Sequence, residues 1–337
     1  MINNPEVIIT GATGFVGRNL IPQIVKYFPK NKILCLIRNQ NTEFEFEGRK
    51  IFKKYGISTK YVDLVMGEGL SNLPKKPKLI IHLAAETDTS KKDHRVNNVG
   101  VKNLYNAFTK LGPETHFIYI GTMVSVVGRK NCKIAINEDT KSSPTNEYTR
   151  TKADGENFLI NKCKKDKFRL TILTPNTIYG KGFRKGSLFY MVINMIKNNS
   201  FITRINWLGK SALIHVNDVI ENIIYFSSRY PKPGVPEKYL LYSENLSISN
   251  ISKLIHKQLN IKYKPINLPK CFWGILSSFR VYFPILESIF PPQLYNYVWR
   301  LSIIIDDVVY TDSQKAFKKN KNWKPKKLET TIKEIIS

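Results

Sequence analysis

The sequence predicts an α/β fold, in which a doubly wound parallel sheet is followed by a smaller mixed α/β C-terminal lobe. Short apolar segments alternate with segments of helical periodicity through the first half of the chain, as expected when helices connect parallel strands. A glycine-rich turn joins the first apolar segment to the first helical one. The 337 residues, 42% of them hydrophobic, suffice for one large domain and a smaller lobe.

The large sheet is expected to use six strands from the first half of the chain. They lie, in order, at 7–10, 33–37, 60–64, 79–83, 117–120 and 170–173. Helical periodicity predicts the connecting helices, and proline or glycine marks where two of them end. These helices are expected at 15–28, before Pro29, at 98–111, before Gly112 and Pro113, and at 148–164.

Beyond residue 180 the alternation becomes less regular. Short strands are expected at 201–205, 213–216 and 239–242, separated by helices. We therefore expect a large domain over residues 1–180, to which about 211–228 return, and a smaller substrate-binding lobe over 181–337.

The turn after the first strand reads Thr10-Gly11-Ala12-Thr13-Gly14-Phe15-Val16-Gly17. Gly11 permits a tight turn, Gly14 lets the backbone approach a pyrophosphate, and Gly17 lets the new helix pack closely on the strand. The first turn of that helix offers free N–H groups to phosphate oxygens. Because the turn follows a strand and opens a helix, it predicts a Rossmann-type dinucleotide site.

Tyr148 and Lys152 stand four residues apart at the start of a predicted helix. This spacing places both side chains on one face. A lysine ammonium beside a phenol favours the phenolate and lowers the tyrosine pKa. We therefore predict that Tyr148 acts as a general acid or base.

The combination of these motifs resembles the extended short-chain dehydrogenase/reductase family, also called the NAD(P)-dependent epimerase/dehydratase family. Further matches follow in family order along nearly the whole chain. They are Asp63-Leu64, His82-Leu83-Ala84-Ala85, Asn97, Asn103-Leu104, Phe117 to Thr122, Pro175 to Gly180, Ile214 to Val219 and Trp323-Lys324-Pro325.

The resemblance implies roles for the matched residues. Asp63 would accept a hydrogen bond from the adenine amino group, and Lys152 would also hold the nicotinamide ribose. Thr122 falls at the family's catalytic serine or threonine and would bind the substrate oxygen while Tyr148 moves the proton. Ser125 is a rival for that role, and Thr122 is preferred because it lies just beyond the strand end. The cofactor cleft would also include Leu64, Leu83, Ala84, Ala85, Asn97, Pro175, Thr177 and Ile178.

Arg38 follows the second strand, where an NAD-selective enzyme would carry an acidic residue. An arginine at this position can accommodate the 2′-phosphate of NADP. We therefore predict NADP as the cofactor, with NAD as the alternative. The competing interpretation is a solvent-exposed arginine that contacts no ligand.

Three departures from the family pattern bear on the reaction. Met123 and Val124 stand where sugar-nucleotide dehydratases carry an Asp-Glu pair, which weakens a dehydratase assignment. Ser211-Ala212 replaces the Arg-Asp pair that is common in sugar-nucleotide epimerases, and Thr174 replaces an arginine before Pro175. The last two departures weaken the case for a nucleotide diphosphate substrate without excluding it.

The formal net charge of +27 allows two interpretations. The lysines can simply cover solvated faces, or they can attract an anionic partner such as a membrane surface, a phosphorylated substrate or nucleic acid. No basic patch in the first half of the chain supports nucleic acid, so no nucleic-acid partner is expected.

Cysteines and histidines give no sign of a metal site. Cys35, Cys132, Cys163 and Cys271 lie far apart, and the five histidines lack ligand spacing. We expect reduced thiols and a cytoplasmic location. No signal-peptide pattern opens the sequence, and no uncharged run reaches the roughly 20 residues of a membrane span.

Segment 271–299 is unusually apolar and aromatic, but Arg280, Pro284 and Glu287 interrupt it. One interpretation is a helical flap that closes the substrate pocket. The other is an interfacial segment that, with the basic surface, contacts a membrane peripherally and takes a lipidic substrate from it. The sequence leaves both open.

The function predicted from the sequence is hydride transfer between a nicotinamide, NADP by preference, and a secondary alcohol or ketone of a small-molecule substrate. Thr122, Tyr148 and Lys152 are the predicted catalytic residues. One alternative is a nucleotide-sugar epimerase, which returns the hydride to the opposite face. A second is a non-catalytic cofactor-sensing protein, against which the complete catalytic set argues. The resemblance also implies a homodimer.

Overall fold

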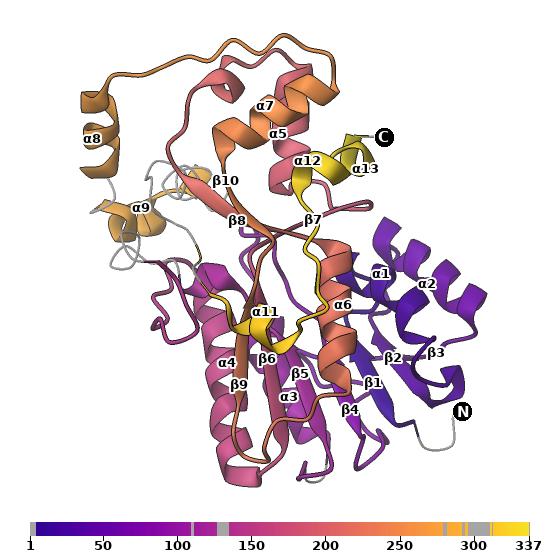
Figure 1. Cartoon of the computed structure of the whole chain (residues 1–337). Coiled ribbons are helices and arrows are strands. Elements are labelled where there is room, and N and C mark those ends of the chain that lie inside the picture. Colours follow the sequence, from indigo (N-terminus) through magenta and orange to yellow (C-terminus); the bar gives the residue numbers. More distant parts are fainter. Residues whose placement is uncertain are drawn as a thin grey trace.

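The computed structural model describes residues 5–108, 111–126, 135–278, 282–291, 294–295, 311 and 313–336. Its larger part is a seven-stranded parallel sheet with strand order β3-β2-β1-β4-β5-β6-β9, and its smaller part contains a three-stranded mixed sheet, β10-β8-β7 (Figure 1). The predicted doubly wound α/β fold with a smaller mixed lobe is therefore confirmed.

Buried apolar residues form the strands of the large sheet. In β1, Val7 and Ile9 pack into the core on one face of the sheet, and Ile8 packs into the core on the other face. This alternation is expected when a strand is covered by helices on both sides. The strands are β1 Val7–Thr10, β2 Ile33–Ile37, β3 Ser58–Tyr61, β4 Leu79–His82, β5 His116–Ile120, β6 Arg169–Pro175 and β9 Glu237–Leu241.

Helices cover both faces of the large sheet. The first face packs against α1 Phe15–Ile24, α2 Glu43–Tyr55 and α6 Val216–Ser227. The opposite face packs against α3 Val99–Asn106 and α4 Glu147–Asp166. The short helix α11 Lys315–Lys319 brings a late segment of the chain back to β9 and to the core beside α6 (Figure 1).

The smaller lobe has a core of its own, which contains Phe189, Trp207, Ile251 and Trp273. Its strands are β7 Thr177–Tyr179, β8 Lys210–His215 and β10 Glu244–Ser247. Its helices are α5 Leu188–Lys197, α7 Ile248–Gln258, α8 Lys270–Ser278, α9 Phe283–Ile289, α12 Leu328–Thr331 and α13 Lys333–Ile336. No helix among the described residues is both long and apolar enough to cross a membrane.

The predicted elements of the first half are present, with shifted ends. Helix α1 ends at Ile24 rather than Phe28, because the N–H groups of Lys26 and Tyr27 bond to the carbonyls of Gln23 and Ile24, three residues back. Strand β3 ends at Tyr61 rather than Leu64, because Asp63 Oδ1 accepts the N–H groups of Val65 and Met66 and turns the chain. Helix α4 begins at Glu147 with a capping box between Asn146 and Thr149.

Two expectations for the second half were wrong. Residues 201–205 do not form a strand, since Phe201–Arg204 is a turn of 3₁₀-helix. The Trp207 indole N–H and the Ser252 hydroxyl donate to the carbonyls of Ile202 and Thr203, which removes those acceptors from any ladder. The strand expected at 239–242 is β9, and it pairs with β6 in the large sheet rather than in the smaller lobe.

Some sequence-based expectations lie outside the described residues. These are the state of Cys132 and the parts of segment 271–299 at 279–281, 292–293 and 296–299. Of the remaining cysteines, Cys35 and Cys163 are buried free thiols and Cys271 is an exposed one.

Candidate active site

A cleft of about 1430 Å³ runs from the glycine turn at the end of β1 into the smaller lobe. The carboxyl ends of β1, β2, β4, β5 and β6 border it, and so do residues of α5 and of the segment before β8. Strand order reverses between β1 and β4, and ligands of open α/β sheets bind at such a point. The topology therefore places the cleft where a dinucleotide is expected.

The glycine turn has the predicted local geometry. Gly11 has a φ of +67°, and a Cβ there would lie 2.5 Å from the backbone nitrogen of Ala84. A Cβ on Gly17 would lie 2.5 Å from the carbonyl oxygen of Gly11, because α1 packs tightly on the strand exit. At Gly14 the nearest atom to a Cβ would be the Gly11 oxygen at 3.2 Å, so the turn leaves backbone accessible from the cleft.

Nearly all of the residues predicted to bind cofactor or to act in catalysis line the cleft. Those that line it are Gly11, Thr13, Gly14, Phe15, Val16, Gly17, Arg38, Asp63, Leu64, Leu83, Ala84, Ala85, Thr122, Tyr148, Lys152, Pro175, Thr177 and Ile178. Asn97 is the exception. Its buried amide bonds to the backbone of Glu86 and to Thr151, so it holds the loop after β4 against α4.

At the adenosine end of the cleft, Arg38 and Asp63 follow neighbouring strands. The Arg38 side chain is 58% exposed, and its Nε lies 3.4 Å from Oε1 of Glu45, which is only 1% exposed. Asp63 uses Oδ1 to accept two backbone N–H groups of its own loop. Its Oδ2 accepts no hydrogen bond from the described residues, and this oxygen fits the predicted acceptor for an adenine amino group.

At the other end, the side chains of Thr122 and Tyr148 line the cleft together. Thr122 follows β5, and its hydroxyl interacts with the phenol of Tyr148 at the start of α4. Burial raises the pKa of Tyr148, and the Thr122 hydroxyl and the charge of Arg184 act to lower it. The rival Ser125 is buried and donates its hydroxyl to the Thr122 carbonyl at 2.8 Å, outside the cleft lining.

Lys152 has a different environment from the one its spacing suggests. Its Nζ donates to the Ile120 carbonyl at 2.6 Å and lies 4.3 Å from the centre of the Tyr119 ring. Burial lowers the pKa of Lys152 to about 7, although Glu156 opposes the shift. Lys152 is not among the groups that act on the Tyr148 pKa. The expected lowering of that pKa by Lys152 is therefore not seen, since the phenol pKa is raised and the ammonium itself is destabilised.

Because the pKa of Lys152 is lowered, we expect the free energy of unfolding to depend on pH. Between pH 7 and the usual lysine value near 10, the unfolded chain holds more of this proton than the folded chain, so the free energy of unfolding rises with pH. The contribution is at most about 1.4 kcal/mol per pH unit. Urea unfolding of the wild type and Lys152→Met at pH 7 and 9.5 should show a smaller rise in the variant. Lys165→Met, on an exposed position of the same helix, is the control, and equal rises in the wild type and Lys152→Met would contradict the assignment.

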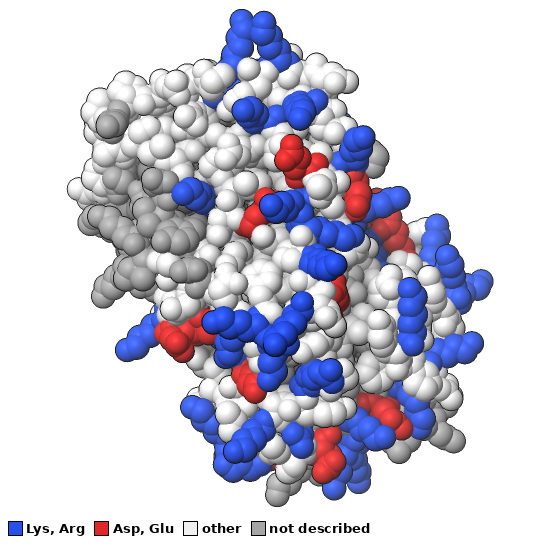
Figure 2. Space-filling view, viewed as in Figure 1, with Lys and Arg blue, Asp and Glu red and all other residues white. Residues whose placement is uncertain are grey.

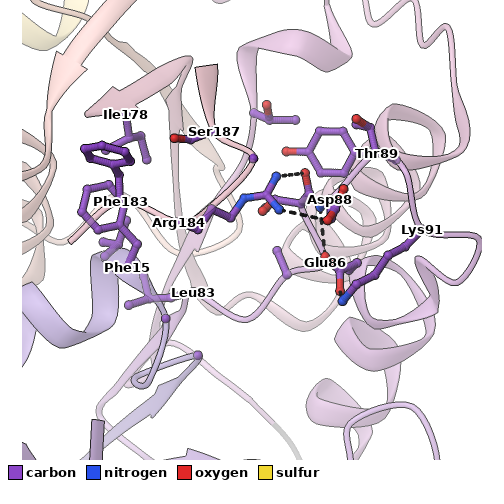
Figure 3. A pocket seen from close by; sticks show the side chains of 18 of the residues that line it. Phe15, Leu83, Glu86, Asp88, Thr89, Lys91, Ile178, Phe183, Arg184 and Ser187 are labelled. Atoms are coloured by element: carbon purple, nitrogen blue, oxygen red, sulfur yellow. Dashed lines mark hydrogen bonds and ion pairs between the residues drawn. The ribbon is translucent and has the colours of Figure 1, made fainter. Parts of the chain in front are cut away.

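Charged residues border the cleft near Tyr148. They were not predicted from the sequence to be part of the site. Arg184 crosses from the loop after β7 and donates to the Thr87 carbonyl at 2.9 Å, with its Nη1 3.4 Å from Asp88 (Figure 3). Glu86 pairs with Lys91 at 2.6 Å in the same loop. The position of Glu86 directly after Ala84-Ala85 could have indicated that it borders the cleft. The pairing of Arg184 with Asp88 joins residues nearly 100 positions apart, and no sequence pattern predicts it.

The described residues do not include any group of three or more His, Cys, Asp or Glu side chains that could hold a metal ion. His82 is buried, which lowers its pKa to about 3, and its Nδ1 lies 2.8 Å from the Thr10 hydroxyl. It is therefore a neutral packing residue between β1 and β4.

The fold and the cleft define a class of protein: an enzyme on a doubly wound sheet with a dinucleotide turn at one end of its cleft and a Thr-Tyr-Lys set at the other. The chain belongs to the NAD dependent epimerase/dehydratase family, whose model matches residues 7–241. The resemblance inferred from the motifs is thus confirmed, and a nicotinamide dinucleotide is the cofactor of this family.

Individual relatives are distant. A dTDP-D-glucose 4,6-dehydratase from Dictyostelium discoideum is 26% identical over 233 residues, which cover 64% of this chain and 54% of that protein. An N-acetyl-alpha-D-glucosaminyl-diphospho-ditrans,octacis-undecaprenol 4-epimerase from Escherichia coli O157:H7 is 24% identical, covering 79% of this chain and 76% of that protein. The structure of RMD from Pseudomonas aeruginosa complexed with NADPH has a TM-score of 0.66 at 16% identity, covering 98% of both chains, and shows the same fold.

Proposed function

We propose that the protein is an NADP-dependent oxidoreductase that reduces a ketone to a secondary alcohol or catalyses the reverse reaction. The pair of Thr122 and Tyr148 carries this proposal, because their side chains interact and line, with Lys152, the cleft that begins at the dinucleotide turn. When bound, the nicotinamide supplies or accepts the hydride.

The side chains of the chain itself account for the proton. In the reduction, the Thr122 hydroxyl donates a hydrogen bond to the substrate carbonyl oxygen and fixes its position. The Tyr148 phenol then donates its proton to that oxygen as the carbonyl carbon receives the hydride. The raised pKa of Tyr148 keeps the phenol protonated at neutral pH, which suits the direction of reduction. With a pKa of about 7, the Lys152 side chain is present in both its ammonium and its amine form near neutral pH.

A dehydratase reaction is less well supported, although the Dictyostelium discoideum relative carries that name. Elimination needs an additional acid and base near Thr122. Met123 is fully buried, with its sulfur 2.7 Å from the Thr311 hydroxyl, and Val124 lines the cleft with an apolar side chain. Neither side chain can transfer a proton.

An epimerase is the second candidate, and the Escherichia coli relative, named as an epimerase of a lipid-linked sugar, favours it. The same catalytic set would serve both reactions. A reductase consumes NADPH, whereas an epimerase regenerates its cofactor in every cycle. Absorbance at 340 nm during turnover of 2-alkanones, UDP-glucose and dTDP-glucose therefore separates them. Loss of absorbance in step with alcohol formation supports the reductase, and product without loss supports the epimerase.

The position of Arg38 supports NADP. Its guanidinium lines the cleft after β2, and a charged hydrogen bond to the 2′-phosphate would replace its weak contact with Glu45. Arg38→Ala is expected to lower the ratio of kcat/KM for NADPH over NADH by about 10- to 100-fold. Steady-state kinetics with both cofactors measures the ratio, and Arg229→Ala, outside the cleft, is the matched control. An unchanged ratio in Arg38→Ala would rule out this role.

A further inference from the structure

The end of the cleft inside the smaller lobe is built mainly from apolar side chains. They come from α5, from the 3₁₀ turn at Phe201–Arg204 and the segment that follows it, and from the start of α7. The apolar residues that line this end, called here the apolar channel, are Leu188, Met191, Val192, Met195, Ile202, Trp207 and Ile248. Methionine side chains adapt to ligands of irregular shape, and such a lining favours an aliphatic or aromatic group over a sugar or a base.

The polar groups beside the apolar channel are largely occupied within the protein. Ser252 donates its hydroxyl to the Thr203 carbonyl at 2.6 Å, and Thr203 donates its own to the Ser200 carbonyl at 2.8 Å. The Ser211 and Thr177 hydroxyls pair with each other at 2.9 Å. These side chains offer little to the base and phosphates of a nucleotide, which need several directed donors and acceptors.

Two of the cations that line the cleft have acidic partners, and Lys210 lines it as well. Arg184 lies against Asp88, and Lys185 Nζ is 3.6 Å from a carboxylate oxygen of Glu43. A diphosphate would have to compete with Asp88 for Arg184. The charge pattern therefore agrees with the departures at Thr174 and Ser211 in disfavouring a nucleotide diphosphate.

The apolar side chains of α8 lie next to the channel wall at Trp207. Trp207 of the channel packs edge-to-face on Trp273 of α8, with ring centroids 5.5 Å apart. Beyond them Phe272 is 40% exposed and Ile275 is 59% exposed, and Ile202 at the channel rim is 37% exposed. Figure 2 shows that most of the surface over α8, at the upper left, is free of the Lys and Arg side chains that crowd the lower half.

We propose that the substrate is amphipathic, with its ketone or alcohol at Thr122 and Tyr148 and an apolar tail that fills the channel. This inference rests on the proposed function, since it assigns the substrate class of the same site. It requires an apolar group in contact with Met195 and Ile202, and it excludes a nucleotide in that place.

A chain-length series tests the proposal. The full-length protein with NADP⁺, which prevents reduction, is titrated with 2-alkanones of five to ten carbons, and binding is followed by tryptophan fluorescence. Two of the four tryptophans, Trp207 and Trp273, border the channel. Each added methylene is expected to lower Kd by about fourfold until the channel is filled. Ile202→Asp should remove most of this dependence, whereas Val235→Asp, which changes an exposed apolar residue outside the cleft, should retain it.

A Kd independent of chain length, or a dependence that Ile202→Asp retains in full, would overturn the proposal. Thermal unfolding followed by circular dichroism checks that Ile202→Asp is folded, and Met195→Lys provides a second disruption of the channel. NADP⁺ affinity and NADPH oxidation are measured separately. Chain-length-dependent binding without hydride transfer would then refute the proposed reaction while supporting the apolar channel.

The tail belongs either to a substrate dissolved in water or to a lipid held in a membrane. Sedimentation with phosphatidylglycerol vesicles, with and without 2-decanone, distinguishes these sources. Ketone-dependent retention on vesicles supports a membrane-borne substrate, and tight binding of the free ketone alone supports a dispersed one. Either outcome, when Ile202→Asp abolishes it, supports a tail in the channel, and the absence of both contradicts the proposal.

Discussion

Tyr148→Phe is expected to lower kcat by about 10²- to 10⁴-fold, because the variant keeps the aromatic ring and loses the proton donor. The phenol interacts with the Thr122 hydroxyl in the cleft, and its ring packs against His94 with centroids 5.8 Å apart. Phenylalanine preserves the ring contact. The loss should therefore appear in catalysis, while NADPH affinity changes by less than about tenfold, since the substitution removes no more than one hydrogen-bonding group.

Steady-state kinetics and NADPH fluorescence titration, performed on the same preparations, measure the two effects. Tyr230→Phe removes a phenol from an exposed position and should leave both quantities unchanged. Full activity of Tyr148→Phe would overturn the catalytic assignment. An equal loss of activity and of NADPH affinity would instead make Tyr148 a binding residue.

Gly11→Ala is expected to lower the free energy of unfolding by about 2–5 kcal/mol. Two costs add at this position. The φ of +67° disfavours any residue with a Cβ by about 1–2 kcal/mol, and the new carbon would meet the backbone of Ala84 at 2.5 Å. Forcing an atom into such a packed position costs about 1–3 kcal/mol more. Because the strand exit must shift, NADPH affinity should fall as well.

Gly67→Ala separates the two costs. Gly67 has a similar φ of +78°, but no atom lies within 4 Å of the position that a Cβ would take. Its substitution should therefore cost only about 1–2 kcal/mol and leave NADPH affinity unchanged. Urea unfolding of both variants gives the comparison. If Gly67→Ala lowers the free energy of unfolding as much as Gly11→Ala, the contact of a Cβ at Gly11 with the Ala84 backbone does not add to the cost.

The parts of the fold that the sequence predicted are those with a local physical signature. Strand β1 and the turn at Gly11 could be predicted because apolar character, glycine positions and the following helix are contiguous in the chain. Helix α4 was predicted within two residues at each end, since its periodicity is supported by the cap at Asn146 and by the left-handed residue at Lys167. Tyr148 and Lys152 fall on that helix and were located with it.

The features that the sequence missed depend on contacts between distant segments. Residues 201–205 include the β-branched Ile202, Thr203 and Ile205, which favour a strand. The side chains of Trp207 and Ser252, however, take the carbonyls that a ladder would need. The pKa of Lys152 depends on its burial, which no spacing rule gives. Arg184 reaches Asp88 only because the loops after β4 and β7 meet across the cleft.

In the proposed reaction, hydride passes from NADPH to a ketone held at Thr122, Tyr148 and Lys152, with net consumption of the cofactor. The most direct measurement uses NADPH with deuterium at C4 of the nicotinamide, in each of its two stereochemical forms, and mass spectrometry of the alcohol formed from 2-alkanones. Deuterium from one form only should appear at the carbinol carbon with the wild type, and Tyr148→Phe should form almost no labelled product. Alcohol without deuterium from either form would rule out hydride transfer from NADPH. Full labelling by Tyr148→Phe would rule out Tyr148 as the proton donor.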